Sequence, residues 1–117
     1  MTSASRRQRA HQTEHAVADY LRTHGWPYAE AVGAGRSGRD VLGVPGIAVE
    51  VKARRDYSPL AWLRQVASTA CDDLPLVVAR PDGMGPASVA AWPVTMRLAD
   101  VVTLLRAAGY GDPEGKS

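Results

Sequence analysis

The amino-acid sequence predicts a single α/β domain with a mixed central sheet flanked by helices. Three observations support this class. Apolar residues recur at helical spacing in residues 10–24 and 59–73, residues 47–53 alternate as a strand does, and residues 76–79 form a short, fully apolar run. The expected order of elements is αβββαβ followed by βα, so helices are expected on both faces of the sheet.

The first helix is predicted over residues 10–24. Gly25, with Pro27 beyond it, supplies the stop signal. Residues 1–9 contain three arginines without apolar periodicity and are predicted to form a disordered basic arm. The residues expected to share the inward face of the helix are Ala10, Val17, Tyr20 and Leu21.

Three strands are expected next, over residues 28–32, 40–43 and 47–53. A glycine-rich segment, residues 33–38, separates the first two, and Pro45 with Gly46 forms a turn between the second and the third. In the third strand odd-numbered and even-numbered side chains leave opposite faces.

Ser58 and Pro59 form an N-cap and first-turn pair, which opens a second helix that ends near residue 73. Residues 76–79 are predicted as a buried strand, residues 89–94 as a further strand weakened by Pro93, and residues 98–105 as a closing amphipathic helix. These elements predict one domain over residues 10–110 and a frayed tail over residues 111–117. The expected inward stripe of the second helix is Leu60, Leu63, Val66, Ala67, Ala70 and Cys71.

Composition narrows the setting in which the protein acts. No apolar run is long enough to cross a bilayer, and the polar N-terminus lacks the apolar stretch of a secretory signal. The single cysteine excludes an internal disulfide. We therefore expect a soluble, cytoplasmic protein of a bacterial or phage-infected cell.

Positive charge is concentrated in the first half of the chain. The net charge is +2, but residues 1–64 hold ten Lys/Arg against six Asp/Glu, whereas residues 65–117 hold four against six. Lys52 stands out, because twelve of the fourteen cations are arginine. This distribution is typical of a protein that binds phosphates, although a solvated basic surface gives the same pattern.

Glu50 and Lys52 lie two residues apart in an interior strand, so both project from one face. A buried, ionised glutamate is costly unless it meets a cation or a metal. Asp40 begins the preceding strand. A two-residue turn at Pro45 and Gly46 alone sets Asp40 opposite Val51, on the wrong face, whereas an odd loop or a bulge sets it opposite Glu50. We predict the second register, in which two carboxylates about 5 Å apart can hold Mg²⁺ or Mn²⁺.

Asp40, followed after nine residues by Glu50, Val51 and Lys52, resembles the motif of the PD-(D/E)xK nuclease superfamily, particularly archaeal-type Holliday junction resolvases and related phage endonucleases. The resemblance covers residues 10–94 and implies a restriction-endonuclease-like αβββαβ core. It implies that Asp40 and Glu50 bind catalytic magnesium, with the Val51 carbonyl as an extra ligand, and that Lys52 orients or activates the attacking water. Arg39 replaces the proline of the family motif.

Two more catalytic residues are implied by the resemblance, Glu14 as a metal ligand on the first helix and Gln65 on the second. Glu14 also falls on the inward face of its helix by spacing alone, although a solvated position in the first turn is the alternative. Gln65 falls away from the apolar stripe, on the side of Trp62 and Thr69, so this side is also a candidate for contact with a partner subunit or DNA.

The function that follows is hydrolysis of DNA phosphodiester bonds, selective for DNA structure such as branches or junctions, in recombination or repair. Resolving a junction needs two symmetric cuts, so the resemblance also implies a homodimer, formed through Trp62 or the closing helix. The arginines expected to bind the DNA backbone are Arg36, Arg39, Arg54, Arg55 and Arg80.

Other interpretations compete with the nuclease. Residues 11–15 match the zinc-peptidase pattern H-x-x-E-H but lack a clear third ligand, and residues 33–38 match G-x-G-x-x-G where no helix can follow. A DNA-binding module without catalysis has the same basic half. Such a module gives no reason for carboxylates to point into a basic site.

Overall fold

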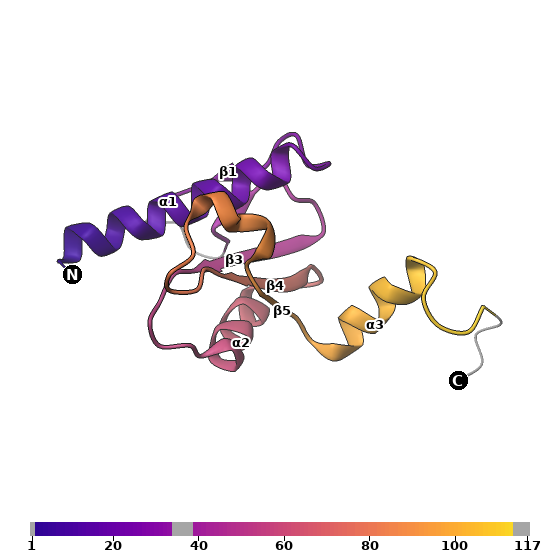
Figure 1. Ribbon diagram of the computed structural model, residues 1–117. Helices are drawn as coiled ribbons and strands as arrows, with labels where there is room; N and C mark the ends of the chain where they lie inside the picture. The colour runs from indigo at the N-terminus through magenta and orange to yellow at the C-terminus, as the bar shows by residue number, and fades with distance from the viewer. Residues whose placement is uncertain (1, 34–38, 114–117) are drawn as a thin grey trace.

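A computed structural model describes residues 2–33 and 39–113, and it contains a five-stranded sheet of order β1-β2-β3-β4-β5 between two helices (Figure 1). β3 and β4 are parallel, while the other neighbouring strands are antiparallel, so the sheet is mixed as predicted. The elements in chain order are α1 (Ser3–Arg22), β1 (Glu30–Ala31), β2 (Val41–Leu42), β3 (Ile47–Lys52), α2 (Pro59–Thr69), β4 (Leu74–Ala79), the 3₁₀ helix η1 (Pro86–Ala91), β5 (Val94–Thr95) and α3 (Leu98–Ala107).

The sheet separates two apolar clusters. On one face, Val17 and Ala18 of α1 pack in the same cluster as Val49 and Val51 of β3. On the other, apolar residues of α2 pack against Ala48, and β3 is therefore buried from both sides. Because residues two apart share a face, Glu50 and Lys52 project on the same side as Ala48.

The β2–β3 hairpin has the register that the sequence predicts, and a bulge produces it. The Ile47 N–H donates to the Val44 carbonyl at 3.2 Å, and Gly46 has a φ of +80°, as the third residue of a type II turn requires. Farther along, Val41 pairs with Val49. Three residues therefore separate Val44 from Val41 on one strand, while two separate Ile47 from Val49 on the other, which is a bulge in β2. Counting on from this pair brings Asp40 level with Glu50.

Gly43 accommodates the bulge. Its φ is +80°, and a Cβ at this position would lie 1.9 Å from the Tyr28 carbonyl oxygen. Only glycine therefore fits where β2 passes the segment before β1.

The N-terminal helix is longer than predicted, and the expectation of a disordered arm over residues 1–9 is wrong from Ser3 onward. Thr2 caps the helix, since its Oγ1 accepts from the Ser5 N–H at 3.1 Å. The arginines that follow favour helix well enough to continue it without apolar contacts. Figure 1 shows this first part of α1 extending beyond the sheet.

Two expectations for the second half of the chain are also corrected. Residues 86–91 form η1 instead of a strand, because Pro86 opens a helical turn and Pro93 leaves only Val94–Thr95 to pair with β4. Helix α2 ends at Thr69, and Cys71 adopts a positive φ of 55° and is exposed, so it is not a core residue.

Helix α3 forms as predicted but projects away from the sheet (Figure 1). Its apolar stripe is largely exposed, with Leu98 at 78% and Leu105 at 45%. Trp62 is instead buried in the α2 cluster, which removes it as an interface residue. No helix within residues 2–33 and 39–113 combines the length and the apolar character needed to span a membrane.

Replacing Gly43 with alanine tests the bulge. Gly43→Ala is expected to lower the free energy of unfolding by more than about 3 kcal/mol, because the new Cβ overlaps the Tyr28 carbonyl and the positive φ is strained. Gly46→Ala is the matched control: its φ is also +80°, but nothing lies within 4 Å of its Cβ, so a loss of about 1–2 kcal/mol is expected. Equal losses in urea unfolding would show that the close approach is absent.

Candidate functional site

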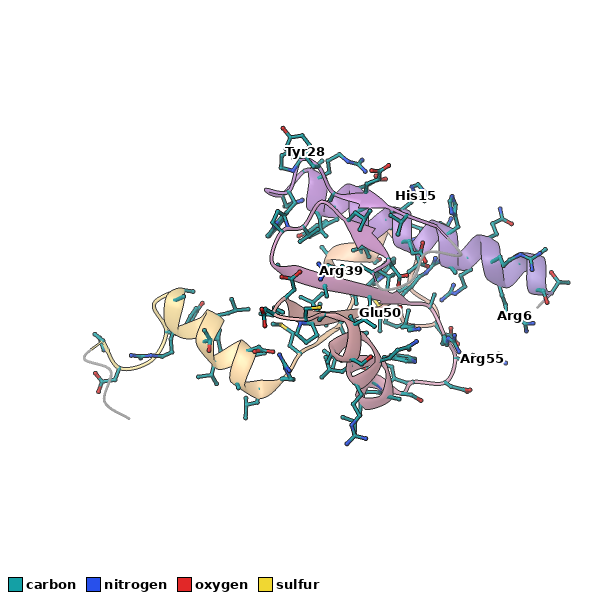
Figure 2. All side chains as sticks on the ribbon, turned by 180° about the vertical axis from the view of Figure 1, so that it is seen from behind. Arg6, His15, Tyr28, Arg39, Glu50 and Arg55 are labelled. Carbon is teal, nitrogen blue, oxygen red and sulfur yellow. The ribbon has the colours of Figure 1, made fainter. Side chains whose placement is uncertain are left out.

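Four charged side chains gather around the start of β2 and the end of β3, and we call them the acid cluster: Glu14, Asp40, Glu50 and Lys52. β3 supplies the last two. The Lys52 Nζ lies 3.4 Å from the Glu50 Oε1, and the two side chains are only 13% and 11% exposed. Figure 2 shows Glu50 within the body of the molecule, on the strand between α1 and α2.

Asp40 is held by the backbone of β3. Its Oδ2 accepts from the Val51 N–H at 2.8 Å, and its own N–H donates to the Val49 carbonyl at 2.9 Å. The Val32 N–H binds the Asp40 carbonyl at 3.1 Å from the other side. The side chain thus takes the place of a strand partner for Val51, which fixes the carboxylate at the mouth of β2.

Burial, and after it the neighbouring Asp40, raises the pKa of two carboxyl groups in the acid cluster. Burial raises the pKa of Glu50 from 4.5 to about 7, and a side-chain hydrogen bond and repulsion from Asp40 add to this increase, while Lys52 opposes it. Burial also raises the pKa of Glu14 to about 7, with Asp40 again contributing. Asp40 is therefore the group that links Glu14 on α1 to Glu50 on β3.

The charges of the acid cluster suit a cation, although its geometry is incomplete for one. Within the described ranges, no three His, Cys, Asp or Glu side chains are placed as a ready metal site. Asp40 and Glu50, which contact each other directly, are the pair that fits a divalent ion with water as further ligands. Asp40 repels both Glu14 and Glu50, and the Lys52 ammonium pairs with Glu50, so a bound cation would relieve the remaining repulsion. The roles of Glu14 and the Val51 carbonyl as ligands stay predictions.

The structure does not bring Gln65 into the acid cluster. Its side chain is exposed on α2 between the buried Leu63 and Val66, which point to the sheet. This agrees with the helical spacing of α2 and not with the role that the family resemblance gives to Gln65.

The predicted DNA-binding arginines have different environments. Arg54 and Arg55 are exposed directly after β3. Arg39 is engaged at the end of α2, where it pairs with Asp73 at 2.6 Å and donates to the Ala70 carbonyl at 3.4 Å. Arg36 lies outside the described residues.

Arg80 is buried, which contradicts its expected contact with DNA. Its Nη1 donates to the Gln12 Oε1 at 2.9 Å and to the Thr13 Oγ1 at 3.1 Å, and its Nε donates to the Met84 carbonyl at 2.8 Å. The guanidinium also lies 5.7 Å from the centre of the Trp92 ring. Burial and the nearby Arg9 lower the pKa of Arg80. Arg80 therefore ties the end of β4 to α1.

Basic side chains of α1 and of the β3–α2 loop gather at one end of the molecule. Asp82 lies between them, 3.5 Å from Arg9 and 3.8 Å from Arg55. Figure 2 shows Arg6 and Arg55 toward this end, with Tyr28 far from them. The sequence indicated these basic residues, but the arginines of residues 1–9 were predicted to lie in a disordered arm, whereas they lie on α1.

A pocket of about 270 Å³ opens beside Lys52, and we call it the Lys52 pocket. It adjoins the acid cluster through this residue. Its lining is Lys52, Arg54, Arg55, Tyr57, Trp62, Ala79, Arg80, Pro81, Asp82 and Pro93. The sequence did not reveal it, because its residues come from four separate segments.

The residues of the zinc-peptidase pattern diverge. His11 and His15 lie on the exposed side of α1, with ring centroids 4.2 Å apart, while Glu14 turns inward toward Asp40. The two histidines and the glutamate do not face a common centre.

The chain matches no protein-family model, no curated protein and no solved structure. The functional argument therefore depends on the acid cluster and its surroundings.

The raised pKa of Glu14 predicts a stability effect that depends on pH. Because the folded-state pKa lies above the unfolded value, the protonated form favours folding, and this stability is lost as the pH rises through about 7. In metal-free protein, Glu14→Gln is expected to raise the free energy of unfolding by about 1 kcal/mol at pH 8.5 and by less at pH 5. This magnitude is discounted for partial solvent contact.

Urea unfolding at the two pH values measures the effect. Glu30→Gln, which removes an exposed carboxylate on β1, is the control and is expected to show no such difference. A gain for Glu14→Gln that is equal at both pH values would contradict a buried, perturbed carboxyl group.

Proposed function

We propose that the protein is a divalent-metal-dependent endonuclease that hydrolyses DNA phosphodiester bonds. The observation that carries the proposal is the convergence of Asp40, Glu50 and Lys52 at the β2–β3 hairpin, with the Asp40 carboxylate fixed by the Val51 N–H. This is the arrangement that the resemblance to PD-(D/E)xK nucleases requires. In the same proposal, α1 and β1 to β4 with α2 form a restriction-endonuclease-like core.

Each side chain has a task that suits its position. Asp40 and Glu50 hold Mg²⁺ or Mn²⁺, and Glu14 assists through Asp40. A bound divalent ion supplies charge neutralisation at the phosphodiester and at the leaving oxygen. The Lys52 ammonium, 3.4 Å from Glu50, orients the attacking water and the scissile phosphate.

The surroundings of the site suit a nucleic-acid substrate. Arg54 and Arg55 are exposed close to Lys52 in the chain, and the N-terminal part of α1 adds Arg6 toward the same end of the molecule (Figure 2). Such cations bind phosphates without reading sequence, so recognition through DNA structure is expected, as for branched or junction substrates.

A DNA-binding module without catalysis is the competing function. Carboxylates close to a DNA-binding surface weaken DNA binding unless a cation offsets them, so the acid cluster argues for the nuclease. Substitution of one carboxylate separates the two functions. In a nuclease it removes cleavage while DNA binding is retained or strengthened, whereas a binding module has no cleavage to lose.

Asp40→Asn is expected to reduce Mg²⁺-dependent cleavage of a labelled four-way junction or flap by at least about a hundredfold while DNA binding is retained or strengthened. EDTA is expected to abolish cleavage by the unsubstituted protein. Asp72→Asn, an exposed carboxylate beyond α2, is the matched control and is expected to leave cleavage unchanged. Binding without cleavage under Mg²⁺ or Mn²⁺, on junction, flap and linear duplex alike, would favour the module.

We also propose that the enzyme acts as a homodimer, as paired cuts at a junction require, through the exposed apolar stripe of α3. Leu105→Glu, which places a charge in this stripe, is expected to convert a dimer to a monomer in sedimentation equilibrium. Thr103→Glu, on the polar side of the same helix, is the control. An unsubstituted protein that stays monomeric with and without junction DNA would refute the dimer.

A further inference from the structure

We propose that the Lys52 pocket receives an unpaired nucleobase of the DNA, next to the phosphate at the acid cluster. The inference rests on the proposed nuclease function and names the substrate class of that same site. It predicts a preference for DNA that carries an unstacked nucleotide over fully paired duplex.

The size of the pocket fits one base. Pockets for drug-sized ligands begin at about 300 Å³, and the Lys52 pocket, at about 270 Å³, lies just below this limit. A single planar ring system therefore fits, whereas a base pair or a folded peptide segment does not.

Two aromatic side chains form part of the wall. Tyr57 meets Trp62 edge-on, with ring centroids 5.6 Å apart and an angle of 88° between the planes. Trp62 is buried in the α2 cluster and so supports Tyr57, which is itself 58% exposed. A supported but exposed aromatic ring is the usual platform on which a protein stacks an unpaired base.

The charges of the pocket favour a nucleotide. Lys52, Arg54 and Arg55 bring three cations to the lining, and Asp82 brings a carboxylate. Arg80 also lines the pocket, but its guanidinium donates to Gln12, Thr13 and the Met84 carbonyl and is not counted among them. The Asp82 carboxylate lies 3.8 Å from Arg55 and 3.5 Å from Arg9, and these two ion pairs hold it in the wall of the pocket. A carboxylate repels phosphate but accepts hydrogen bonds from the amino groups of bases, so Asp82 favours entry of the base and not of its phosphate.

Lys52 couples the pocket to the acid cluster. It lines the pocket and lies 3.4 Å from the Glu50 carboxylate, so a nucleotide whose base is seated has its phosphate close to Asp40 and Glu50. In a paired duplex the base must first leave the stack, which costs free energy that a bulge, a flap or a branch point does not require.

The test measures binding by the full-length protein in EDTA, where no cleavage occurs. The probes are two duplexes of equal length, one fully paired and one with a single unpaired 2-aminopurine, a fluorescent adenine analogue. We expect tighter binding of the bulged duplex by about tenfold, with quenching of the 2-aminopurine fluorescence on stacking.

Variants of Tyr57 assign the preference to the pocket. Tyr57→Ala is expected to remove most of the preference for the bulge and the quenching, with binding of paired duplex unchanged, whereas Tyr57→Phe retains both. Tyr28→Ala, an exposed tyrosine far from the pocket, is the matched control and is expected to behave as the unsubstituted protein.

Each result bears on the inference. Equal binding of both duplexes, or a preference that survives in Tyr57→Ala, overturns the base pocket. If paired duplex is nevertheless bound and is cleaved once Mg²⁺ is added, the proposed nuclease function stands without it. If neither duplex nor a four-way junction is bound, either in EDTA or with Mg²⁺, both proposals fail together.

Discussion

The hydrogen bond from the Val51 N–H to the Asp40 carboxylate, 2.8 Å long, is the contact on which the candidate site depends. It exists only because the β2–β3 hairpin gains one residue between its turn and the Val41–Val49 pair. Without the bulge at Gly43, Asp40 would lie level with Val51 and project into the apolar cluster beneath α1. A single glycine that fits against the Tyr28 carbonyl thus determines which face of the sheet carries the acid.

The acid cluster opposes the stability of the fold that carries it. Glu50 sits in the central strand with apolar neighbours before and after it, and burial together with Asp40 raises its pKa to about 7. An isoleucine or valine at this position would be expected to stabilise the strand. Strongly perturbed carboxyl groups held close together are typical of functional sites, and here the two apolar clusters on either side of the sheet offset their cost.

The sequence predicted the sheet and the central site better than it predicted the surroundings. The strand around Glu50 and the inward face of α1 follow from alternation and helical spacing, which report on local geometry. Alternation left two hairpin registers open, and the predicted one was chosen because it brings Asp40 and Glu50 together. Burial of Arg80 and Trp62 depends on contacts between distant segments, which local sequence patterns do not report. The start of α1 at Ser3 was missed because a helix without apolar periodicity gives no signal beyond its N-cap.

The buried hydrogen bonds of Arg80 determine how α1 presents Glu14 to the acid cluster. Its guanidinium donates to Gln12 and Thr13, the two residues that precede Glu14, and therefore fixes the rotation of α1 about its own axis. A rotation of α1 by one residue, about 100°, would replace Glu14 with His15 on the side of Asp40. Arg80, which was expected to bind DNA, thus acts inside the protein, where it keeps the Glu14 carboxyl group turned toward Asp40.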